Sequence, residues 1–254
     1  MFSLQNKHAV ITGAGSGIGR AVALLFARQG ATVYVADVNE AQATEVVKEI
    51  EAGGGKASAL VADVSDQKKI VQLFSGLAGL DILVNSAGVS HIGSAETTGE
   101  ADFDRLYNVN VKGVYNCLHA AIPLMKKNKG GVILNMGSIA ALVGLPDRFA
   151  YAMTKGAVSA MTLSVAKDYL HDNIRCNSIS PARVHTPFVD GFLKKNYPGK
   201  EAEMFEKLSK TQPIGRMAKP EEIASLILYL CSEEASFITG CDYPIDGGFT
   251  TLNN

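Results

Sequence analysis

TGAGSGIG, residues 12–19, is a glycine-rich turn between two apolar segments. The run before it, HAVIT at 8–12, is short, apolar and partly β-branched, which predicts a buried strand. The run after it, RAVALLFA at 20–27, is a good helix former with an apolar stripe. Such a turn lets the backbone approach a pyrophosphate, and the helix that follows presents unpaired N–H groups to it. The sequence therefore predicts a nucleotide-binding loop.

The glycines of this loop stand at 13, 17 and 19, which is not the general dinucleotide spacing G-x-G-x-x-G. A flexible turn with no ligand would need fewer glycines, so the nucleotide interpretation is the better one. The residues expected to contact the nucleotide here are Gly13, Ser16, Gly17, Ile18 and Gly19.

Asp37 ends the second predicted strand, ATVYVAD at 31–37, 18 residues after Gly19. An acidic residue about 20 positions beyond the glycines suits the ribose 2′-hydroxyl of NAD and repels the 2′-phosphate of NADP. Its neighbours Val38 and Asn39 offer no cation for an extra phosphate. The alternative is that Asp37 caps the next helix. We expect NAD rather than NADP, with Asp37 and Val38 among the contacts.

Apolar runs alternate with helical patterns along the rest of the chain. Further strands are expected at 57–62, 81–85, 131–137, 174–180 and 243–246, and helices at about 40–52, 100–127, 151–170 and from Pro220. Pro244 assigns the last strand to an edge. This alternation predicts a doubly wound α/β fold with helices on both faces. We expect a single Rossmann-type domain over residues 1–254, with a seven-stranded parallel sheet in the order 3-2-1-4-5-6-7.

Composition argues against several classes of protein. The formal net charge of -1 favours neither nucleic acid nor an anionic membrane as a partner. No apolar run reaches the ~20 residues that span a bilayer, and the first residues do not form a signal peptide. The four cysteines, at 117, 176, 231 and 241, are widely spaced, which predicts neither a metal site nor a disulfide framework. We expect a cytoplasmic protein.

Tyr151 and Lys155 lie four residues apart in YAMTK, residues 151–155. On a helix this spacing puts both side chains on one face. The ammonium group is expected to lower the pKa of the phenol from its usual ~10, which makes Tyr151 a candidate general acid/base. Ser138, at the carboxyl end of a predicted strand, is a hydroxyl able to hold a substrate oxygen. The same spacing also occurs by chance on surface helices.

Taken together, these motifs resemble those of the short-chain dehydrogenase/reductase family over nearly the whole chain. The matching residues are TGAGSGIG at 12–19, Asp63, NSAG at 85–88, Asn110, Ser138, YAMTK at 151–155, ITG at 238–240 and IDGG at 245–248. The chain departs from the family pattern at Ser86, which is usually asparagine, and at Ala182, which is usually a glycine after the proline.

The resemblance implies an oxidoreductase that interconverts a secondary alcohol and a ketone with a nicotinamide cofactor. Tyr151 would exchange the proton of the substrate oxygen, Lys155 would lower its pKa and bind the nicotinamide ribose, and Ser138 would position the oxygen. Asn110 would hold a water that links Lys155 to solvent. A homotetramer is also implied. The further cofactor contacts that the resemblance implies are Asp63, Val64, Asn85, Ala87, Gly88, Pro181, Val184 and Thr186.

Substrate preference is expected to come from loops at the carboxyl ends of strands four to six and from a helical lid at about 187–212. The candidate substrate residues there are His91, Arg148, Arg183 and His185. These side chains suggest a small polar or anionic alcohol or ketone, such as a sugar, sugar acid or hydroxy acid, or a lactol and its lactone. Arg183 would grip a carboxylate in bidentate fashion, although a surface or interface position is the alternative.

Two other functions stay open. The same motifs allow an NADP-dependent reductase of 3-oxoacyl thioesters, which Asp37 and the lack of nearby cations disfavour. A non-catalytic nucleotide-binding scaffold on the same fold is the third hypothesis, and the presence of both Tyr151 and Lys155 favours a catalyst over it.

Overall fold

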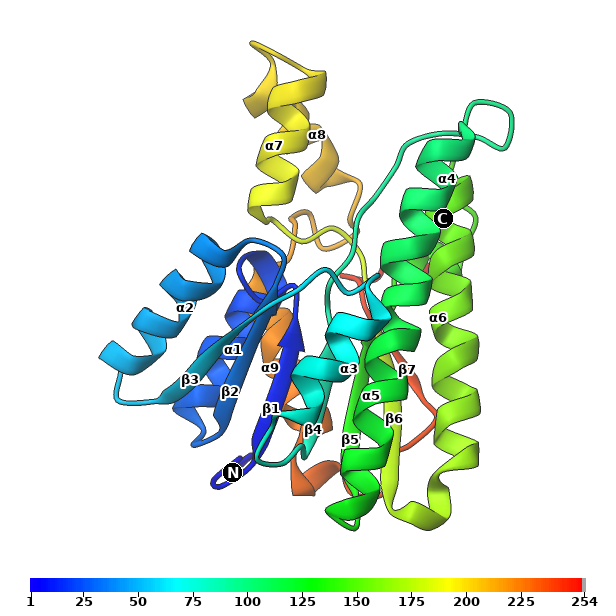
Figure 1. The fold of residues 1–254 in the computed structure, drawn as a ribbon. Coiled ribbons are helices and arrows are strands. Elements are labelled where there is room, and N and C mark those ends of the chain that lie inside the picture. The colour runs from blue at the N-terminus through cyan, green and yellow to red at the C-terminus, as the bar shows by residue number, and fades with distance from the viewer. Residues whose placement is uncertain (253–254) are drawn as a thin grey trace.

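The computed structural model describes residues 1–252, apart from the side chain of Asn196, and within them the chain forms one seven-stranded parallel sheet (Figure 1). The strand order is β3-β2-β1-β4-β5-β6-β7, so the predicted fold class and order are confirmed. The chain reverses its winding between β1 and β4, which leaves a crevice at the carboxyl ends of these strands. The strands are β1 (His8–Thr12), β2 (Thr32–Asp37), β3 (Lys56–Val61), β4 (Ile82–Asn85), β5 (Gly131–Met136), β6 (Ile174–Pro181) and β7 (Asp242–Ile245).

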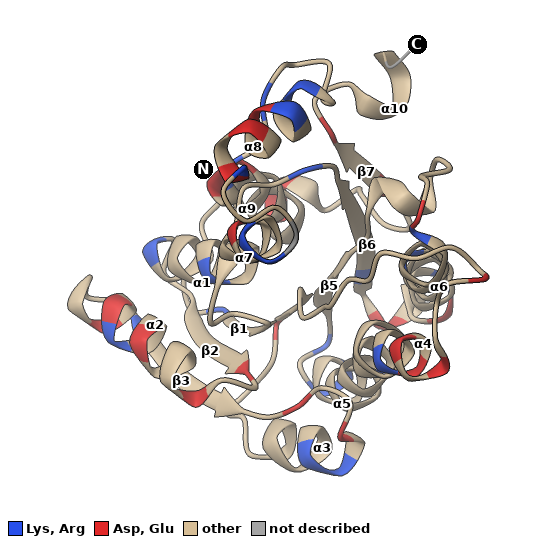
Figure 2. Ribbon diagram, turned by 90° about the horizontal axis from the view of Figure 1, so that it is seen from above, with Lys and Arg blue, Asp and Glu red and all other residues tan. Residues whose placement is uncertain are grey.

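Helices cover both faces of the sheet, α1, α2 and α9 on one and α3, α5 and α6 on the other (Figures 1 and 2). The α-helices are α1 (Gly17–Arg28), α2 (Glu40–Ala52), α3 (Gln67–Ser75), α4 (Glu100–Leu106), α5 (Gly113–Lys127), α6 (Phe149–Asp168), α7 (Pro187–Asn196), α8 (Glu201–Lys210), α9 (Pro220–Cys231) and α10 (Phe249–Leu252). Three short 3₁₀ segments in the described chain are η2 (Ile139–Ala141), η3 (Leu170–Asp172) and η4 (Glu233–Ala235). None of the helices in residues 1–252 is long and apolar enough to cross a membrane.

The strands read as nearly continuous apolar runs because both of their faces are buried. In β1, Ala9 and Ile11 belong to the core under α1 and α9, whereas Val10 belongs to the core under α3 and α5. Each core has a phenylalanine at its centre that is not solvent-exposed, Phe26 in the first and Phe74 in the second. The sheet is therefore rigid where its carboxyl ends support loops.

The predicted helix at 100–127 is wrong in one respect. A π-helical segment, η1 (Tyr107–Lys112), separates α4 from α5. Asn110 in this segment is 1% exposed, and its amide bonds the backbone of Val89 and the hydroxyl of Thr154. A widened turn is a common way for a helix to accommodate such a tertiary contact at a functional site.

The predicted lid is helical, as expected, and consists of α7 and α8 above the carboxyl ends of the strands on the side of α1 and α9 (Figures 1 and 2). A parallel bridge between Val184 and Ala218 joins the two ends of this segment. Its hydrogen bonds run from the His185 N–H to the Ala218 carbonyl and from the Ala218 N–H to the Arg183 carbonyl, each 2.9 Å.

Other helix and strand ends agree with the sequence to within two residues, except that α1 begins at Gly17, three residues before the predicted start at Arg20. The helix predicted to begin at Tyr151 begins at Phe149 and ends at Asp168 rather than near Leu170. It stops there because a 3₁₀ turn follows, closed by Asn173 in the left-handed conformation. Strand β7 contains Pro244 and is the edge strand beside β6, as predicted.

Candidate active site

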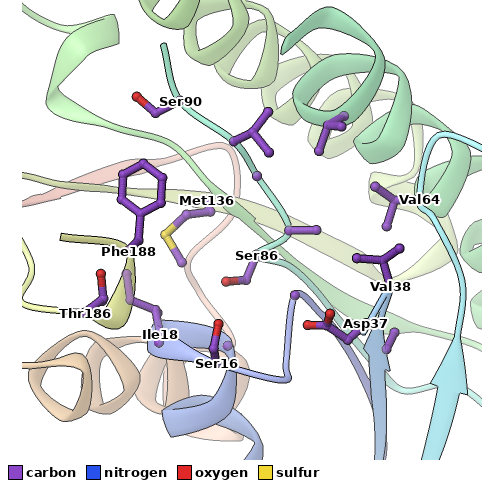
Figure 3. A pocket seen from close by; sticks show the side chains of 18 of the residues that line it. Ser16, Ile18, Asp37, Val38, Val64, Ser86, Ser90, Met136, Thr186 and Phe188 are labelled. Carbon is purple, nitrogen blue, oxygen red and sulfur yellow. The ribbon is translucent and has the colours of Figure 1, made fainter. Parts of the chain in front are cut away.

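A cleft of about 480 Å³ lies at the carboxyl ends of the strands, between the glycine-rich turn and the loops after β2, β3 and β4. Figure 3 shows Asp37 and Val38 at one end of it and Phe188 and Ser90 at the other. The predicted cofactor residues that line it are Gly13, Ser16, Gly17, Ile18, Gly19, Asp37, Val38, Asp63, Val64, Ala87, Gly88, Tyr151, Lys155 and Thr186. Segments far apart in the chain thus meet around one cavity.

The glycine-rich turn has the shape that a phosphate group requires. Gly13 and Gly17 have φ angles of 64° and 54°, which other residues rarely adopt. A Cβ atom on Gly19 would lie 2.3 Å from the carbonyl oxygen of Gly13, so the turn is too tight for a side chain there. Helix α1 starts at Gly17 without a side-chain cap, which leaves its first N–H groups free for an anion. These residues fit a bound dinucleotide.

The carboxylate of Asp37 lies against this turn. Its Oδ2 accepts the N–H of Gly15 at 2.8 Å and its Oδ1 accepts the N–H of Asn39 at 2.9 Å. The cap of α2 is Asn39, whose side chain accepts the N–H of Gln42, so the alternative role of Asp37 as that cap is wrong. The described residues that line the cleft carry one cation, Lys155, which lies far along the cleft from Asp37 on a different element.

Tyr151, Lys155 and Ser138 meet at the far end of the cleft. Tyr151 and Lys155 project from the start of α6, and the Nζ of Lys155 lies 5.7 Å from the centroid of the Tyr151 ring. Lys155 donates to the carbonyl of Met136 at 2.7 Å, which ties it to the end of β5. Ser138 follows β5 directly and hydrogen-bonds the phenol of Tyr151. The helix and the strand end together fix this group.

The pKa values differ from the sequence expectation. Burial raises the pKa of the Tyr151 phenol above its usual value, while the hydrogen bond from Ser138 and the charge of Arg148 lower it. Burial also lowers the pKa of the Lys155 ammonium to about 8. The pKa of Tyr151 is therefore raised rather than lowered as the sequence predicts, because the burial that disfavours the phenolate outweighs the groups that favour it. Arg148 supplies a charge effect that the sequence reasoning missed.

Asn110 lies beside this group, but its side chain is engaged elsewhere. Its Oδ1 accepts the N–H of Val89 at 2.8 Å, and its Nδ2 donates to the Val89 carbonyl at 2.9 Å and to Thr154 at 3.1 Å. The amide thus holds the loop after β4 against α6. Thr12 supports the same loop, because its hydroxyl accepts the N–H groups of Ser86 and Ala87, both at 3.1 Å. Sequence reasoning missed Thr12, whose signal is a polar side chain ending an apolar strand.

Three predicted cofactor residues lie outside the cleft lining. Asn85 is in the core, 2% exposed, where its side chain donates to that of Asn135 at 2.8 Å. Pro181 and Val184 line an adjoining cavity instead. The bridge to Ala218 uses backbone groups of the residues that flank Val184, so among the described residues the N–H and carbonyl of Val184 itself have no partner. They are available to an amide group of a ligand.

The adjoining cavity, of about 850 Å³, opens from the cleft under the lid helix α7. Tyr151 lines both hollows, and Ser138 lines the second. His91, Arg148 and Arg183 line the second cavity as predicted. His185 is the exception among the candidate substrate residues. Its ring pairs with Asp190 at 2.8 Å and packs edge-on against Phe205, and it is not among the described residues that line this cavity.

Residues 13–250 match the model of the family described as enoyl-(acyl carrier protein) reductase. Dehydrogenase/reductase SDR family member 6 of Rattus norvegicus is 39% identical over 251 residues, which cover 98% of this chain and 100% of the relative. The 2-keto-3-deoxy-L-fuconate dehydrogenase of Xanthomonas campestris pv. campestris is 37% identical over 248 residues, 97% of this chain and 81% of the relative. L-sorbose reductase from Gluconobacter frateurii, solved with NADPH and L-sorbose, superposes with a TM-score of 0.93 at 28% identity over 98% of each chain.

Proposed function

The chain belongs to the short-chain dehydrogenase/reductase family, and on that premise we propose that it is an NAD-dependent dehydrogenase of a polar secondary alcohol. The substrate would be a sugar, a sugar acid or a hydroxy acid, or a lactol oxidised to its lactone. The observation that carries the proposal is the position of Tyr151, which lines both the nucleotide cleft and the adjoining cavity. Relatives that act on a keto sugar acid and on a ketose support the substrate class.

Each member of the site has a distinct role in this proposal. A bound nicotinamide ring supplies the acceptor or donor of the hydride. Tyr151 exchanges a proton with the substrate oxygen, and Ser138 holds that oxygen through its hydroxyl. Lys155, tied to the Met136 carbonyl, keeps the ribose side of the site in place and stabilises the phenolate when it is protonated. Phe188 on α7 covers the junction of the two hollows and excludes water.

We prefer NAD to NADP because of the charge around Asp37. Its carboxylate lies on the glycine-rich turn, where it would accept hydrogen bonds from a ribose and repel a 2′-phosphate. A side chain at position 15 would clash with the carboxylate, since a Cβ atom there would lie 2.9 Å from Oδ2. Position 15 therefore cannot provide a phosphate-binding cation without displacing Asp37.

A single cytoplasmic domain that assembles into a homotetramer is also part of the proposal. Helix α6 carries large apolar side chains on its exposed side as well as on its buried side, which is typical of a helix packed on two sides. Phe149 and Leu163 on α6 are 48% and 59% exposed, and Tyr107 and Tyr115 on the neighbouring helices are also exposed. A second chain packed on this face would bury them.

The test is NADH or NADPH formation across a panel of secondary alcohols, including aldoses, deoxy sugars, sugar acids, 3-hydroxy acids and steroids. We expect turnover of sugars or acids with NAD+. Tyr151→Phe should lower kcat by about 10²–10⁴-fold and leave the dissociation constant of NADH nearly unchanged. Tyr115→Phe, at an exposed tyrosine of α5, is the matched control. Substantial turnover by Tyr151→Phe, or activity restricted to NADPH and 3-oxoacyl thioesters, would contradict the proposal.

A further inference from the structure

The cavity beside the nucleotide cleft has an unusual charge for this protein. Its described lining contains four cationic side chains and one carboxylate, whereas the whole chain carries a formal net charge of -1. The cations are Arg105, Arg148, Arg183 and Lys195, and the carboxylate is Asp102. A cavity lined mainly by one sign of charge attracts a ligand of the opposite sign. The excess positive charge is therefore concentrated in the cavity that would hold the substrate.

Asp102, the single carboxylate of this lining, is paired with neighbouring side chains. Asp102 accepts a hydrogen bond from Arg105 at 3.0 Å and lies 3.5 Å from the ring of His91. Arg105 and, through its charge, Lys195 both lower the pKa of Asp102. Asp102 thus balances the outer part of the cavity wall, and Arg148 and Arg183 form no ion pair with any acidic side chain in the described part of the chain.

Arg148 and Arg183 line the same cavity, and both are half-buried. Burial lowers the pKa of the Arg183 guanidinium, and the charge of Arg148 lowers it further. Arg148, the residue directly before the start of α6, also lowers the pKa of the Tyr151 phenol through its charge. Two half-buried like charges without a counter-ion destabilise each other, and an anion between them removes that cost.

Each guanidinium is held by one hydrogen bond and keeps the rest of its donors. Arg148 donates from Nη1 to the carbonyl of His91 at 3.2 Å, and Arg183 donates from Nε to the hydroxyl of Thr211 at 3.1 Å. A guanidinium carries five N–H groups in a planar fork that matches an oxoanion. Among the described residues, the remaining N–H groups of both arginines have no partner. These N–H groups are available to a ligand in the cavity that both side chains line.

We propose that Arg148 and Arg183 bind an oxoanion of the substrate together, so that this dehydrogenase acts on hydroxy acids or phosphorylated sugars rather than on neutral alcohols. The inference rests on the proposed function and narrows its substrate class. Arg148 directly precedes α6, Tyr151 lies in the first turn of that helix, and both line this cavity. The anionic group is therefore a short carbon chain away from the carbon that carries the reacting hydroxyl.

The experiment compares charged substrates with uncharged partners of the same shape at saturating NAD+. Hydroxy acids of three to six carbons are paired with their primary amides, and sugar phosphates with the free sugars, which distinguishes a carboxylate from a phosphate ester. We expect kcat/KM to be about 10–100-fold higher for the charged member of the preferred pair. Arg183→Gln should remove most of that preference, mainly through KM, and change kcat/KM for the uncharged member by less than about threefold. Arg148→Gln should also remove the preference, but it should lower kcat for both members because its charge lowers the pKa of Tyr151. Arg28→Gln, on the exposed last turn of α1, is the matched control.

A binding arm separates this inference from the proposed function. The same acids and phosphates are titrated calorimetrically into the Tyr151→Phe protein with NAD+, with and without each arginine substitution. Equal kcat/KM for charged and uncharged members, or an equal loss for both in the arginine variants, overturns the inference and leaves NAD-dependent turnover standing. Arginine-dependent binding without any turnover upholds the anion site and overturns the proposed function. Neither binding nor turnover overturns both.

Discussion

Lys155 is only 5% exposed, and its Nζ donates to the Met136 carbonyl. This burial disfavours the charged form of its side chain. Burial lowers its pKa to about 8 from the usual 10.5. Below about pH 8 the folded and unfolded chains both carry the proton, and the folded chain bears the whole cost of the buried charge. Between these two values the unfolded chain binds more protons, so stability rises with pH. The buried charge of Lys155 thus lowers the stability of the fold at a site that our proposal makes catalytic.

Replacing Lys155 by methionine should therefore stabilise the fold while abolishing turnover. We expect the free energy of unfolding at pH 7 to rise by about 1–3 kcal/mol, with the gain shrinking as the pH rises through 8 to 10.5. Urea denaturation at pH 7 and pH 10 measures both effects. Lys210→Met, which removes an exposed ion pair with Glu206, is the control and should change stability little. A Lys155→Met protein less stable than the original at pH 7 would refute this account.

Asp37 is the residue on which cofactor preference depends in our proposal. Removing its carboxylate with Asp37→Ala eliminates both the ribose acceptor and the repulsion of a 2′-phosphate. We expect the ratio of kcat/KM for NAD+ over NADP+ to fall by about 10–100-fold. Steady-state kinetics with both cofactors measure it, and Asp104→Ala, at an exposed carboxylate of α4, should leave the ratio unchanged. An unchanged ratio in Asp37→Ala would end the assignment.

His185 and Asn85 show that the sequence does not predict the direction of a side chain. A motif fixes the position of a residue along the chain, but the direction of its side chain depends on the alternation of an extended backbone. Val184 faces the cavity, so His185, the next residue, faces outward to Asp190. Asn85 ends β4 in register with Asn135, and the two amides pair inside the sheet. Neither outcome is visible in the sequence.

At the scale of elements, the strand order and most helix ends were predictable because each strand is a short apolar run and each helix begins or ends at a recognisable residue. The interruption of the α4–α5 helix was not predictable. It depends on Asn110 bonding Val89 and Thr154, which are 21 and 44 residues away in sequence. Local helix propensity cannot encode a contact of that range.

Arg175 joins three elements and should be a main determinant of how they hold together. It donates from β6 to the carbonyls of Leu230 and Ser232, at the end of α9, and of Ile238, before β7. Arg175→Met would leave these carbonyls without their partner, and we expect the free energy of unfolding to fall by about 2–4 kcal/mol. Chemical denaturation measures it, with Arg28→Met as the exposed control. A loss below about 0.5 kcal/mol, the usual range of surface substitutions, would contradict this role.

At the scale of the whole molecule, the exposed apolar side chains of α6 predict a contact between copies of the chain. Leu163→Glu puts a charge in that face, and burying an unpaired charge disfavours association. We expect the tetramer that we propose to dissociate to smaller species at micromolar concentration, as measured by light scattering after gel filtration. Val71→Glu, at an exposed valine of α3, is the control. A tetramer that survives Leu163→Glu, or a protein that is monomeric before the substitution, would argue against the α6 interface.

The bridge between Val184 and Ala218 brings the two ends of the lid segment to one point beside β6. The sheet therefore does not dictate how many residues lie between them, and the entropic cost of a longer excursion grows only slowly with its length. The segment from 186 to 217 can therefore change in length or sequence while its two ends stay in place. Insertions, deletions or recombination with a relative would change the shape of the lid above the candidate active site and leave the strand order intact. Proteins with this fold can therefore evolve different substrate preferences while they catalyse the same type of reaction.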